Sequence, residues 1–343
     1  MQKLAHYLWF KSKFVYRLLL PLSWCYALVV IIRQRLFQFG FLHSYRSKVP
    51  VLIVGNITVG GNGKTPVVLW IIEQLKKYDI EVGVISRGYG ANPPFTPFLV
   101  ADSNDPKVTG DEPMLIYERT GVDVVISPNR QKAIELILQR SPDVKLIISD
   151  DGLQHYALKR DIEWVVIDAK KQFGNKHFLP AGPLRESIRR LRSIDAAIIN
   201  YGSNKTLTQN QSIVELPSSI HKAFLFLEPF DAVNLLSGDT RKLSDFTDVN
   251  AIAGIGFPER FYTLLQENGI NVVDTKDFKD HHIFEHQDLV SFKKSNLPLF
   301  MTEKDAQKCK ILATDNWWYV PVKSVIPAQS GEVLINQLLK KLH

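Results

Sequence analysis

Cysteine is scarce in this sequence, and its scarcity narrows the chemistry that the chain offers. The two cysteines among 343 residues are Cys25 and Cys309, which stand too far apart in the chain to form a metal-binding or redox motif. This usage is typical of a protein in a reducing compartment. The chain has no internal repeat and no low-complexity segment. Its 45% hydrophobic and 22% charged residues are ordinary for a globular protein long enough for two domains.

Acidic residues are absent from the first 72 positions, and Glu73 is the first to appear. Residues 1–48 carry eight basic residues: Lys3, Lys11, Lys13, Arg17, Arg33, Arg35, Arg46 and Lys48. The net charge of the whole chain is +7, so residues 49–343 together carry −1. A near-neutral body lacks the basic surface that coats nucleic acid. We therefore expect no nucleic-acid partner, and nothing in the sequence indicates an obligate protein partner.

The basic segment 1–48 contains the longest apolar run of the chain, from Leu18 to Ile32. These 15 residues fall short of the roughly 20 that a spanning helix needs, although tilt or the preceding residues could lengthen it. No small-residue cleavage site follows, which argues against a signal peptide. Flanking aromatic and basic residues favour a helix lying in or on a membrane over a buried core helix. Pro21 kinks this helix or marks its first turn, and the positive flanks indicate a cytoplasmic body.

Residues 51–66, VLIVGNITVGGNGKTP, combine an apolar strand, a glycine-rich loop and a Lys-Thr pair. The phosphate-binding pattern G-x-x-x-x-G-K-[ST] is met at Gly63, Lys64 and Thr65, but Thr58 stands where the first glycine belongs. Glycines at such positions let backbone N–H groups surround a phosphate, and the following helix adds its positive end. Lys64 would then reach the β- and γ-phosphates and Thr65 the Mg²⁺ ion. The alternative is a plain glycine turn.

Beyond residue 50 the pattern of apolar runs and helical periodicity predicts two α/β domains, 49–225 and 226–343, with a cleft between them. Val/Ile-rich runs of this kind are typical of a parallel sheet that is buried on both faces, and a phosphate loop belongs at its carboxyl edge. The expected strands are 51–55, 81–86, 123–126, 145–149, 162–167 and 195–199 in the first domain, and 249–255, 270–274, 298–301 and 317–320 in the second. The expected helices are 64–77, 112–119, 128–140, 256–269, 285–295, 302–311 and 330–342, and the polar residues 200–212 are a connector or a hairpin.

A phosphate loop leaves three classes open: a kinase, a GTPase switch and an ATPase that remodels a partner. A GTPase should carry an N-K-x-D guanine reader, and neither Asn204-Lys205 nor the TEKD at 302–305 matches it. Membrane-associated remodelling ATPases often have a lysine just before the paired glycines, where this chain has Val59. Both classes become less favoured, and neither is excluded.

Four stretches carry further candidate chemistry. ISDDGLQH ends a buried strand with Asp150 and Asp151, where a Walker-B carboxylate would meet Mg²⁺, and two buried acids are costly without a cation. GDEP places Asp111 at a helix start, where it could act in catalysis or simply cap the helix. GPLRE at 182–186 offers a site or a surface ion pair. KDHHIF offers His281 as an oriented imidazole or as an exposed histidine.

Together these stretches resemble the tetraacyldisaccharide 4'-kinases, the lipid A kinases of Gram-negative bacteria. GNITVGGNGKTP, SRGYG, GDEP, DDGLQH, AGPLRE, DHH and TEKDAQKC stand in the family's order from the N-terminal helix to about residue 310, and the displaced first glycine is shared. The resemblance implies a P-loop NTPase-like parallel-sheet domain, a second smaller α/β domain and a membrane-associated helix. It implies transfer of the ATP γ-phosphate to the 4'-hydroxyl of a tetraacylated glucosamine disaccharide 1-phosphate. It places the protein at the cytoplasmic face of the inner membrane.

The candidate roles follow from the loop chemistry and the resemblance together. The ATP cradle comprises Thr58, Val59, Gly60, Gly61, Asn62, Gly63, Lys64 and Thr65, and the metal ligands are Thr65, Asp150 and Asp151. By resemblance Asp111 is the base that accepts the sugar proton, and His281 tunes or orients it. The candidate substrate-binding residues are Arg87, Tyr89, Arg130, Gln154, Arg185 and Glu186.

Overall fold

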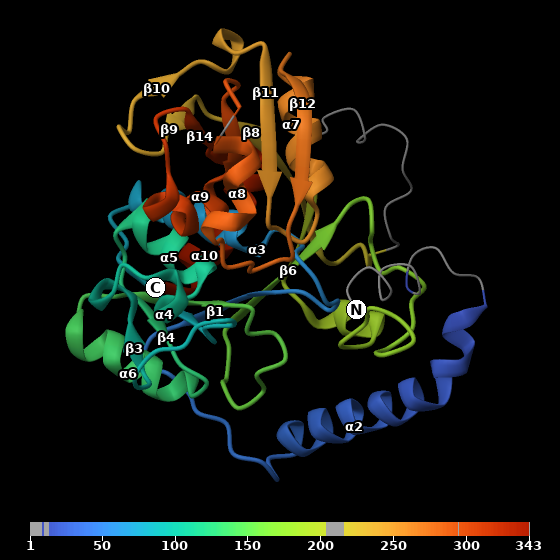
Figure 1. The fold of residues 1–343 in the computed structure, drawn as a ribbon. Helices are drawn as coiled ribbons and strands as arrows, with labels where there is room; N and C mark the ends of the chain where they lie inside the picture. The colour runs from blue at the N-terminus through green and yellow to red at the C-terminus, as the bar shows by residue number, and fades with distance from the viewer. Residues whose placement is uncertain (1–8, 10–13, 204–215, 294, 343) are drawn as a thin grey trace.

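The computed structural model of the protein describes residue 9 and residues 14–203, 216–293 and 295–342. Two sheets, one in each lobe, organise the chain (Figure 1). Lys3, Lys11 and Lys13 of the basic segment lie outside the described residues, as do residues 204–212 of the predicted connector.

The large sheet has nine strands in the order β15-β8-β7-β6-β1-β5-β2-β4-β3. Its strands from β8 to β4 are all parallel, and the edge strands β15 and β3 are antiparallel. The strands are β1 (Val51–Gly55), β2 (Val82–Ser86), β3 (Phe98–Leu99), β4 (Val124–Ile126), β5 (Leu146–Asp150), β6 (Ile162–Asp168), β7 (Ala196–Gly202), β8 (His221–Pro229) and β15 (Val322–Val325). The six strands predicted for the first domain are confirmed as β1, β2, β4, β5, β6 and β7, with bounds that differ by at most three residues.

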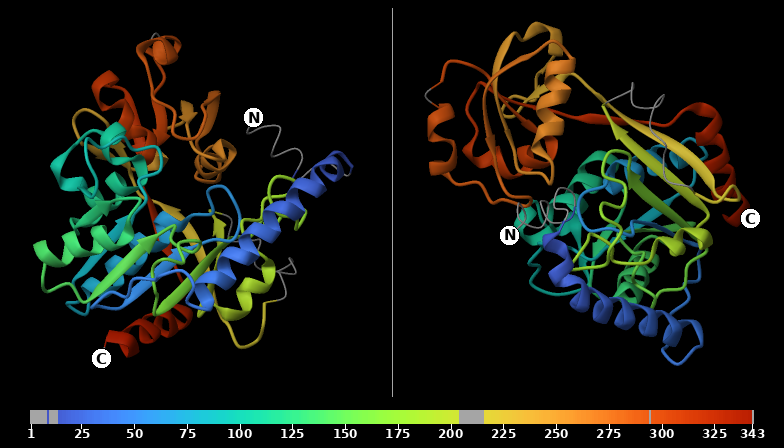
Figure 2. Two further views of the ribbon diagram at one scale, coloured as in Figure 1. Left: turned by 90° about the horizontal axis from the view of Figure 1, so that it is seen from below. Right: turned by 90° about the vertical axis from the view of Figure 1, so that its right-hand side faces the viewer.

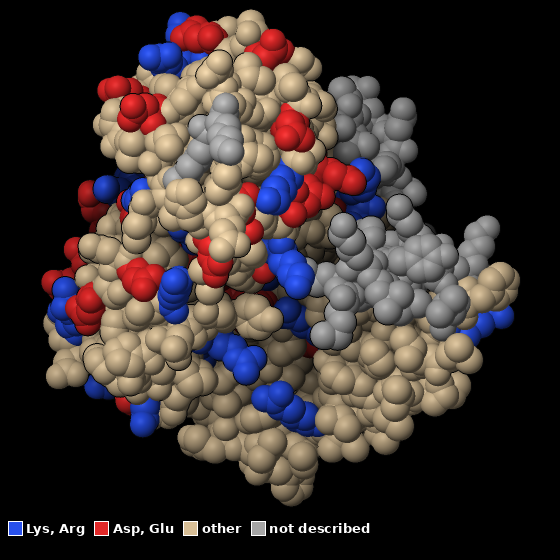
Figure 3. Space-filling model, viewed as in Figure 1, with Lys and Arg blue, Asp and Glu red and all other residues tan. Residues whose placement is uncertain are grey.

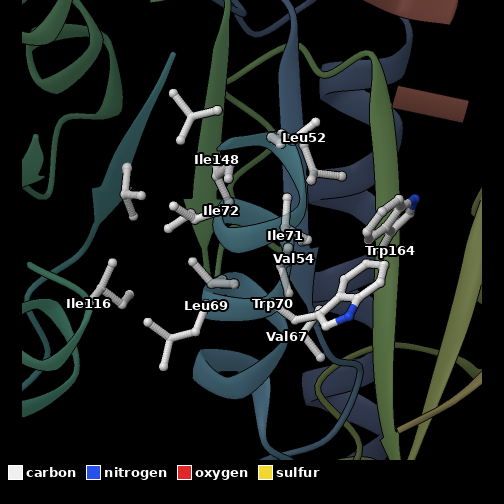
Figure 4. Close-up of a cluster of buried hydrophobic side chains, with 14 of the residues drawn as sticks. Leu52, Val54, Val67, Leu69, Trp70, Ile71, Ile72, Ile116, Ile148 and Trp164 are labelled. Carbon is white, nitrogen blue, oxygen red and sulfur yellow. The ribbon is translucent and has the colours of Figure 1, made fainter. Parts of the chain in front are cut away.

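Helices cover both faces of the large sheet, because successive side chains of each strand point to opposite faces. On one face α3 (Lys64–Lys76), α5 (Asp111–Thr120) and α10 (Ala328–Leu342) pack on residues such as Leu52 and Val54 (Figure 4). On the other face α6 (Arg130–Arg140) packs on the alternate residues of the strands. The short helices of this lobe are η3 (Val100–Asp102), α4 (Pro106–Thr109) and η4 (Ile188–Ser193).

The second sheet has six strands in the order β10-β9-β14-β13-β11-β12, of which β14, β13, β11 and β12 are parallel. Its strands are β9 (Ala232–Asn234), β10 (Thr240–Arg241), β11 (Asp248–Ala253), β12 (Asn271–Asp277), β13 (Leu299–Thr302) and β14 (Trp317–Val320). Its helices are η6 (Leu243–Asp245), α7 (Pro258–Glu267), α8 (His286–Lys293), α9 (Glu303–Cys309) and η7 (Lys310–Leu312). We call this unit the small lobe and the rest of the chain after residue 48 the large lobe.

The predicted boundaries 49–225 and 226–343 need correction at both ends of the second domain. Residue 225 falls inside β8, and the chain returns to the large sheet after residue 321, where β15 pairs antiparallel with β8. The C-terminal helix α10 then packs on the core of the large lobe, where Gly331 lies against the Trp70 ring. Figure 2 shows this helix, in red, beside the large lobe and away from the small lobe. The small lobe thus spans only about residues 230–321, and two paired strand ends connect it to the large lobe.

The N-terminal helix is longer than its apolar run predicts. It comprises η2 (Val15–Leu19) and α2 (Leu20–Gln38), with Pro21 in the first turn of α2 as one of the two alternatives had it. Among the described residues, Tyr16–Gln38 is the one helical stretch that is long and apolar enough to cross a membrane by length and composition alone. Most of its large apolar side chains are exposed; Leu18 is 83% exposed and Trp24 66%.

Candidate active site

The glycine-rich loop connects β1 to α3, as predicted, at the carboxyl edge of the large sheet. Gly63 precedes α3 with a φ of +84°, and Gly60 has a φ of +105°. No backbone or side-chain hydrogen bond within the described residues uses the N–H groups of Gly60, Gly61, Asn62 or Gly63. These four donors are therefore available to a phosphate. The Val59 N–H instead donates to the Pro183 carbonyl over 2.9 Å, so this member of the predicted cradle contributes to holding the loop.

Two asparagines fix the shape of this loop. Asn62 Nδ2 donates to Thr58 Oγ1 over 2.9 Å. Asn200, at the end of β7, donates from its buried amide to the Asn62 carbonyl over 3.0 Å. Thr58 therefore holds the loop through its hydroxyl group at the position where the usual pattern has a glycine. One hydrogen bond within the loop and one from β7, far along the chain, therefore hold the conformation of the loop.

Lys64 and the end of β5 form the charged part of the site. Lys64 Nζ lies 3.5 Å from Asp151 Oδ1, and Arg185 Nη1 lies 3.2 Å from both Asp151 oxygens. Burial alone would raise the pKa of Asp151, but Lys64 and Arg185 outweigh it and lower this pKa. The predicted position of both aspartates is confirmed, because Asp150 is the last residue of β5 and Asp151 follows it.

Asp150 is the candidate metal ligand with an unused oxygen. The residue is 5% exposed, and its Oδ1 atom has no hydrogen-bond partner among the described residues. Burial raises the pKa of Asp150 to about 7, although nearby Lys64 favours the charged form. Thr65 lies in the first turn of α3. No cluster of three or more His, Cys, Asp or Glu side chains that could hold a metal ion exists in the described part of the chain, so a cation here would depend on Thr65, phosphate oxygens and water for its other ligands.

Asp111 and His281 meet across the two lobes. Asp111 is the first residue of α5, and His281 lies after β12 in the small lobe with a φ of +62°. His281 Nδ1 and Asp111 Oδ2 are 3.2 Å apart. The contact with Asp111 raises the pKa of His281 despite partial burial. The N-cap of α5 is Gly110, so Asp111 does not serve the capping role that its position suggested.

Two lysines of α9 complete this cluster, and the residue analysis of the sequence missed them. Lys308 Nζ lies 3.2 Å from Asp111 Oδ2, and Lys304 Nζ lies 2.6 Å from Glu112 Oε1 and 3.1 Å from Asp280 Oδ1. Burial opposes the charged form of Asp111, but His281 and the two lysines lower its pKa. Burial would lower the pKa of Lys304, yet the carboxylates of Glu112, Asp280 and Asp111 raise it. The spacing of four residues in TEKDAQKC, which puts both lysines on one helix face, was the available signal.

The candidate substrate residues lie around this cluster in different settings. Tyr89 is 73% exposed, and its ring centroid is 5.5 Å from that of His281. Arg87 and Tyr89 line a pocket of about 330 Å³ beside it. Arg130 is buried and donates to the Ser127 carbonyl over 2.8 Å, and burial lowers its pKa to about 10.

Of the remaining substrate candidates, Gln154 and Arg185 lie beside the phosphate loop, and Glu186 lies beside α2. Gln154 donates to the Asn56 carbonyl over 2.9 Å and accepts from Arg185 over 3.4 Å, so both residues stand at the phosphate loop. The buried Glu186 faces the other way, where it accepts a hydrogen bond from Gln34 of α2 over 3.1 Å and lies 3.4 Å from Arg190 Nε. The alternative for GPLRE, a surface ion pair between Arg185 and Glu186, is therefore not found among the contacts of the described residues.

Comparisons with known proteins agree with this geometry. The family model of the tetraacyldisaccharide-1-P 4'-kinases matches residues 15–342. Tetraacyldisaccharide 4'-kinases of Pasteurella multocida and Hamiltonella defensa are 49% and 43% identical to the chain, over 94% and 98% of both sequences. A crystal structure of LpxK from Aquifex aeolicus in complex with ATP is 27% identical, with a TM-score of 0.78, and covers 96% of this chain and 100% of that one.

Proposed function

Because the chain belongs to the tetraacyldisaccharide-1-P 4'-kinase family, we propose that it transfers the γ-phosphate of ATP to the 4'-hydroxyl of a tetraacylated glucosamine disaccharide 1-phosphate. The product is the 4'-phosphorylated lipid A precursor. The observation that carries the proposal is that the small lobe brings His281 to Asp111 and the neighbouring Asp280 to the phosphate loop. His281 Nδ1 and Asp111 Oδ2 are 3.2 Å apart, and a Cβ placed on Gly256 would lie 3.6 Å from Asp280 Oδ2 and 3.9 Å from the Gly61 nitrogen. The ATP complex of the Aquifex aeolicus relative supports ATP as the donor.

The nucleotide phosphates are bound by the loop between β1 and α3. The free N–H groups of residues 60–63 and the N-terminus of α3 bind negative charge without any side chain. Lys64 adds a full positive charge, and its ion pair with Asp151 holds its ammonium group near the loop. Phosphoryl transfer depends mainly on such positioning and on charge stabilisation.

The residues present fit a Mg²⁺ ion. The unpartnered Oδ1 of the buried Asp150 is a donor in need of a cation, and Thr65 is the hydroxyl residue that follows the loop lysine. Asp151 is engaged by Lys64 and Arg185, so it would act on the ion through water. When bound, the ion neutralises charge on the phosphate oxygens.

The acceptor hydroxyl is activated at Asp111. Its Oδ2 contacts His281 and Lys308, whereas no hydrogen bond within the described residues uses its Oδ1, so this oxygen is the one that would accept the sugar proton. A carboxylate with a lowered pKa is a weak base, which suits a loose transition state in which the proton leaves late. His281 orients the carboxylate and spreads the charge of the pair.

The N-terminal helix brings this site to the lipid. The exposed apolar side chains of α2 suit insertion into a membrane surface, and its cations Arg17, Arg33 and Arg35 suit anionic headgroups. Gln34 connects α2 to Glu186, next to the Arg185 that pairs with Asp151. This arrangement supports action at the cytoplasmic face of the inner membrane.

A radiolabel assay tests the function directly. Purified protein, γ-labelled ATP and tetraacyl disaccharide 1-phosphate in mixed micelles should yield a labelled lipid that carries phosphate at the 4'-position. An ATPase that remodels a partner would release free phosphate with no lipid product, and that result would refute the kinase assignment.

A double-mutant cycle tests the residue roles. Asp111→Asn and His281→Ala should each lower kcat more than they raise the KM for ATP, because the pair acts on the attacking hydroxyl. If the two residues act as one unit, the double variant should be little worse than the poorer single variant. Additive losses would mean independent roles. Near-normal activity of Asp111→Asn would remove Asp111 from the mechanism, since asparagine cannot take up the proton.

A further inference from the structure

Asp305 is a fully buried carboxylate of α9 that the proposed mechanism leaves without a role. The residue lies in the small lobe and is 0% exposed. Its Oδ2 atom accepts a hydrogen bond from the Gly254 N–H over 2.9 Å and another from Thr302 Oγ1 over 2.6 Å. Thr302 is the N-cap of α9, and Gly254 follows the last residue of β11. One carboxylate oxygen therefore joins the start of this helix to the end of strand β11.

The second oxygen of Asp305 faces Lys308. Lys308 Nζ lies 3.2 Å from Asp305 Oδ1 and 3.2 Å from Asp111 Oδ2, so one ammonium group is shared by two buried carboxylates of different lobes. No hydrogen bond within the described residues ends at Asp305 Oδ1, so this oxygen is compensated by the charge of Lys308. The lysine is itself enclosed, with 7% of its side chain exposed and its ammonium nitrogen 5.4 Å from the centroid of the Phe284 ring. Because an unpaired buried charge is costly, Asp305 and Lys308 depend on each other.

The contact of Asp305 with Gly254 leads to the phosphate loop. Gly254 begins the segment 254–257, which connects β11 to α7. A Cβ atom at Gly254 would lie 2.8 Å from Asp305 Oδ1, so no larger residue fits there unless one of the two moves. Two residues later, a Cβ atom at Gly256 would lie 3.9 Å from the nitrogen of Gly61, one of the free donors of the phosphate loop. The bond from Gly254 to Asp305 therefore fixes where this segment of the small lobe approaches the nucleotide site.

We propose that Asp305 is a positioning residue whose two oxygens have separate tasks. Oδ1 holds Lys308 within reach of the proposed base Asp111, and Oδ2 holds the segment 254–257 beside the phosphate loop. The inference rests on the proposed function, because that function makes Asp111 a base and the loop a site for ATP. The charge of Asp305 keeps the ammonium group of Lys308 between two carboxylates. Without that charge the ammonium group is drawn onto Asp111 alone, which then accepts a proton less readily.

The first test neutralises Asp305 without changing its shape. In Asp305→Asn the carbonyl oxygen still accepts hydrogen bonds from Gly254 and Thr302, whereas the amide group no longer attracts Lys308. With ATP and tetraacyl disaccharide 1-phosphate in mixed micelles, kcat should fall roughly tenfold, as expected for a displaced base, and the KM for ATP should stay unchanged. The matched control is Asp274→Asn, which removes an exposed carboxylate from β12 of the same lobe and should leave both values as in the wild type.

The second test displaces the segment 254–257. Gly254→Ala places a methyl group against the Asp305 carboxylate, which Thr302 and Lys308 hold in place, so the segment has to yield. This variant should raise the KM for ATP severalfold and change kcat less than Asp305→Asn does. A merely structural role of Asp305 would instead change kcat and KM alike in both variants.

A double variant tests the pairing of Asp305 with Lys308 and serves also if Asp305→Asn folds poorly. Lys308→Met leaves two buried carboxylates without their cation, whereas Asp305→Asn/Lys308→Met leaves one. The double variant should therefore melt at a higher temperature than Lys308→Met, and its kcat should be no lower.

A wild-type kcat of Asp305→Asn would overturn the proposal, as would equal changes of kcat and KM in Asp305→Asn and Gly254→Ala. A double variant that melts below Lys308→Met would refute the pairing of Asp305 with Lys308. If the wild type forms no lipid phosphate at all, the proposed function itself fails, and the melting temperatures still decide whether the two residues are paired.

Discussion

Gly63→Ala should destabilise the protein more than an alanine substitution at a glycine with open space around it. The structure separates the expected loss of stability into two parts, backbone strain and the displacement of Asn200. Gly63 has a φ of +84°, and a left-handed backbone costs alanine about 1–2 kcal/mol. A methyl group there would also collide with the amide nitrogen of Asn200. If Asn200 moves away, it loses its bond to the Asn62 carbonyl (3.0 Å) and the bond that it accepts from the Gly202 N–H (2.9 Å), each worth about 1 kcal/mol.

The expected loss is therefore about 3–4 kcal/mol, which lowers the Tm by roughly 6–16 °C at ~2–4 °C per kcal/mol. Differential scanning calorimetry measures this change, and the shift of Tm by added ATP reports the damage to the loop. The control is Gly121→Ala, where φ is +71° but the space around a methyl group is open, so only the backbone strain of about 1–2 kcal/mol should appear.

The double variant Gly63→Ala/Asn200→Ala completes the test. Once the Asn200 amide is gone, the alanine at position 63 should add only the backbone strain, so the two losses should fall short of additivity by about 2 kcal/mol. If Gly63→Ala costs no more than Gly121→Ala, the phosphate loop is not held by Asn200 and the reasoning is wrong.

Three further outcomes are expected. Lys64→Ala should lower the transfer rate by about 10²–10³, as for other lost electrostatic groups, with Lys77→Ala at the far end of α3 as the control; near-normal turnover would count against the nucleotide site. Removal of residues 1–45 should release the protein from membranes in sedimentation assays, and continued sedimentation would reveal a second attachment surface. Asp111 raises the pKa of His281, so their contact is strongest below the ordinary value of about 6.5 and is lost as the pH rises through the raised pKa. Asp111→Asn should therefore lower the pKa of His281 in an NMR titration, and an unchanged pKa would contradict the contact.

The parts of the site that could be predicted from the sequence depend on local signals. The loop at residues 58–65 could be placed because strand, glycines, Lys-Thr and helix are adjacent in the chain. Asp150 and Asp151 could be placed at the sheet edge because parallel strands bring their carboxyl ends to one side. The same reasoning put Asp111 at a helix start, but it could not distinguish a cap from a residue that faces the other lobe.

The parts that could not be predicted depend on pairing between distant segments. The four residues of β15 are too short to reveal that they pair with β8, almost a hundred positions earlier, and α10 follows them to the large lobe. The hydrogen bond from Asn200 to Asn62 joins β7 to the loop that follows β1, and these two strands are not neighbours in the sheet. Such contacts are set by the fold as a whole, and neither periodicity nor motif spacing contains them.

The charged contacts between α5 and α9 explain how two lobes can hold the proposed catalytic pair, Asp111 and His281. Four residues on one side of α9 contact α5: Glu303 pairs with Arg119, Lys304 with Glu112, Gln307 with Glu118 and Lys308 with Asp111. Figure 3 shows Lys, Arg, Asp and Glu side by side where the lobes meet.

These contacts matter for the proposed chemistry because Asp111 lies in the large lobe but has its charged partners in the small lobe. Its backbone is fixed by α5 in the large lobe, whereas His281 and Lys308, which set its charge and orientation, come from the small lobe. A single exposed ion pair contributes little, but a part-buried network of several pairs resists separation as a unit. Any opening about the paired strand ends of β8 and β15 must break these contacts together, and it also leaves Asp111 without His281. Separation of the lobes would therefore switch off the proposed base, so that phosphoryl transfer is restricted to the state in which both lobes enclose the cleft.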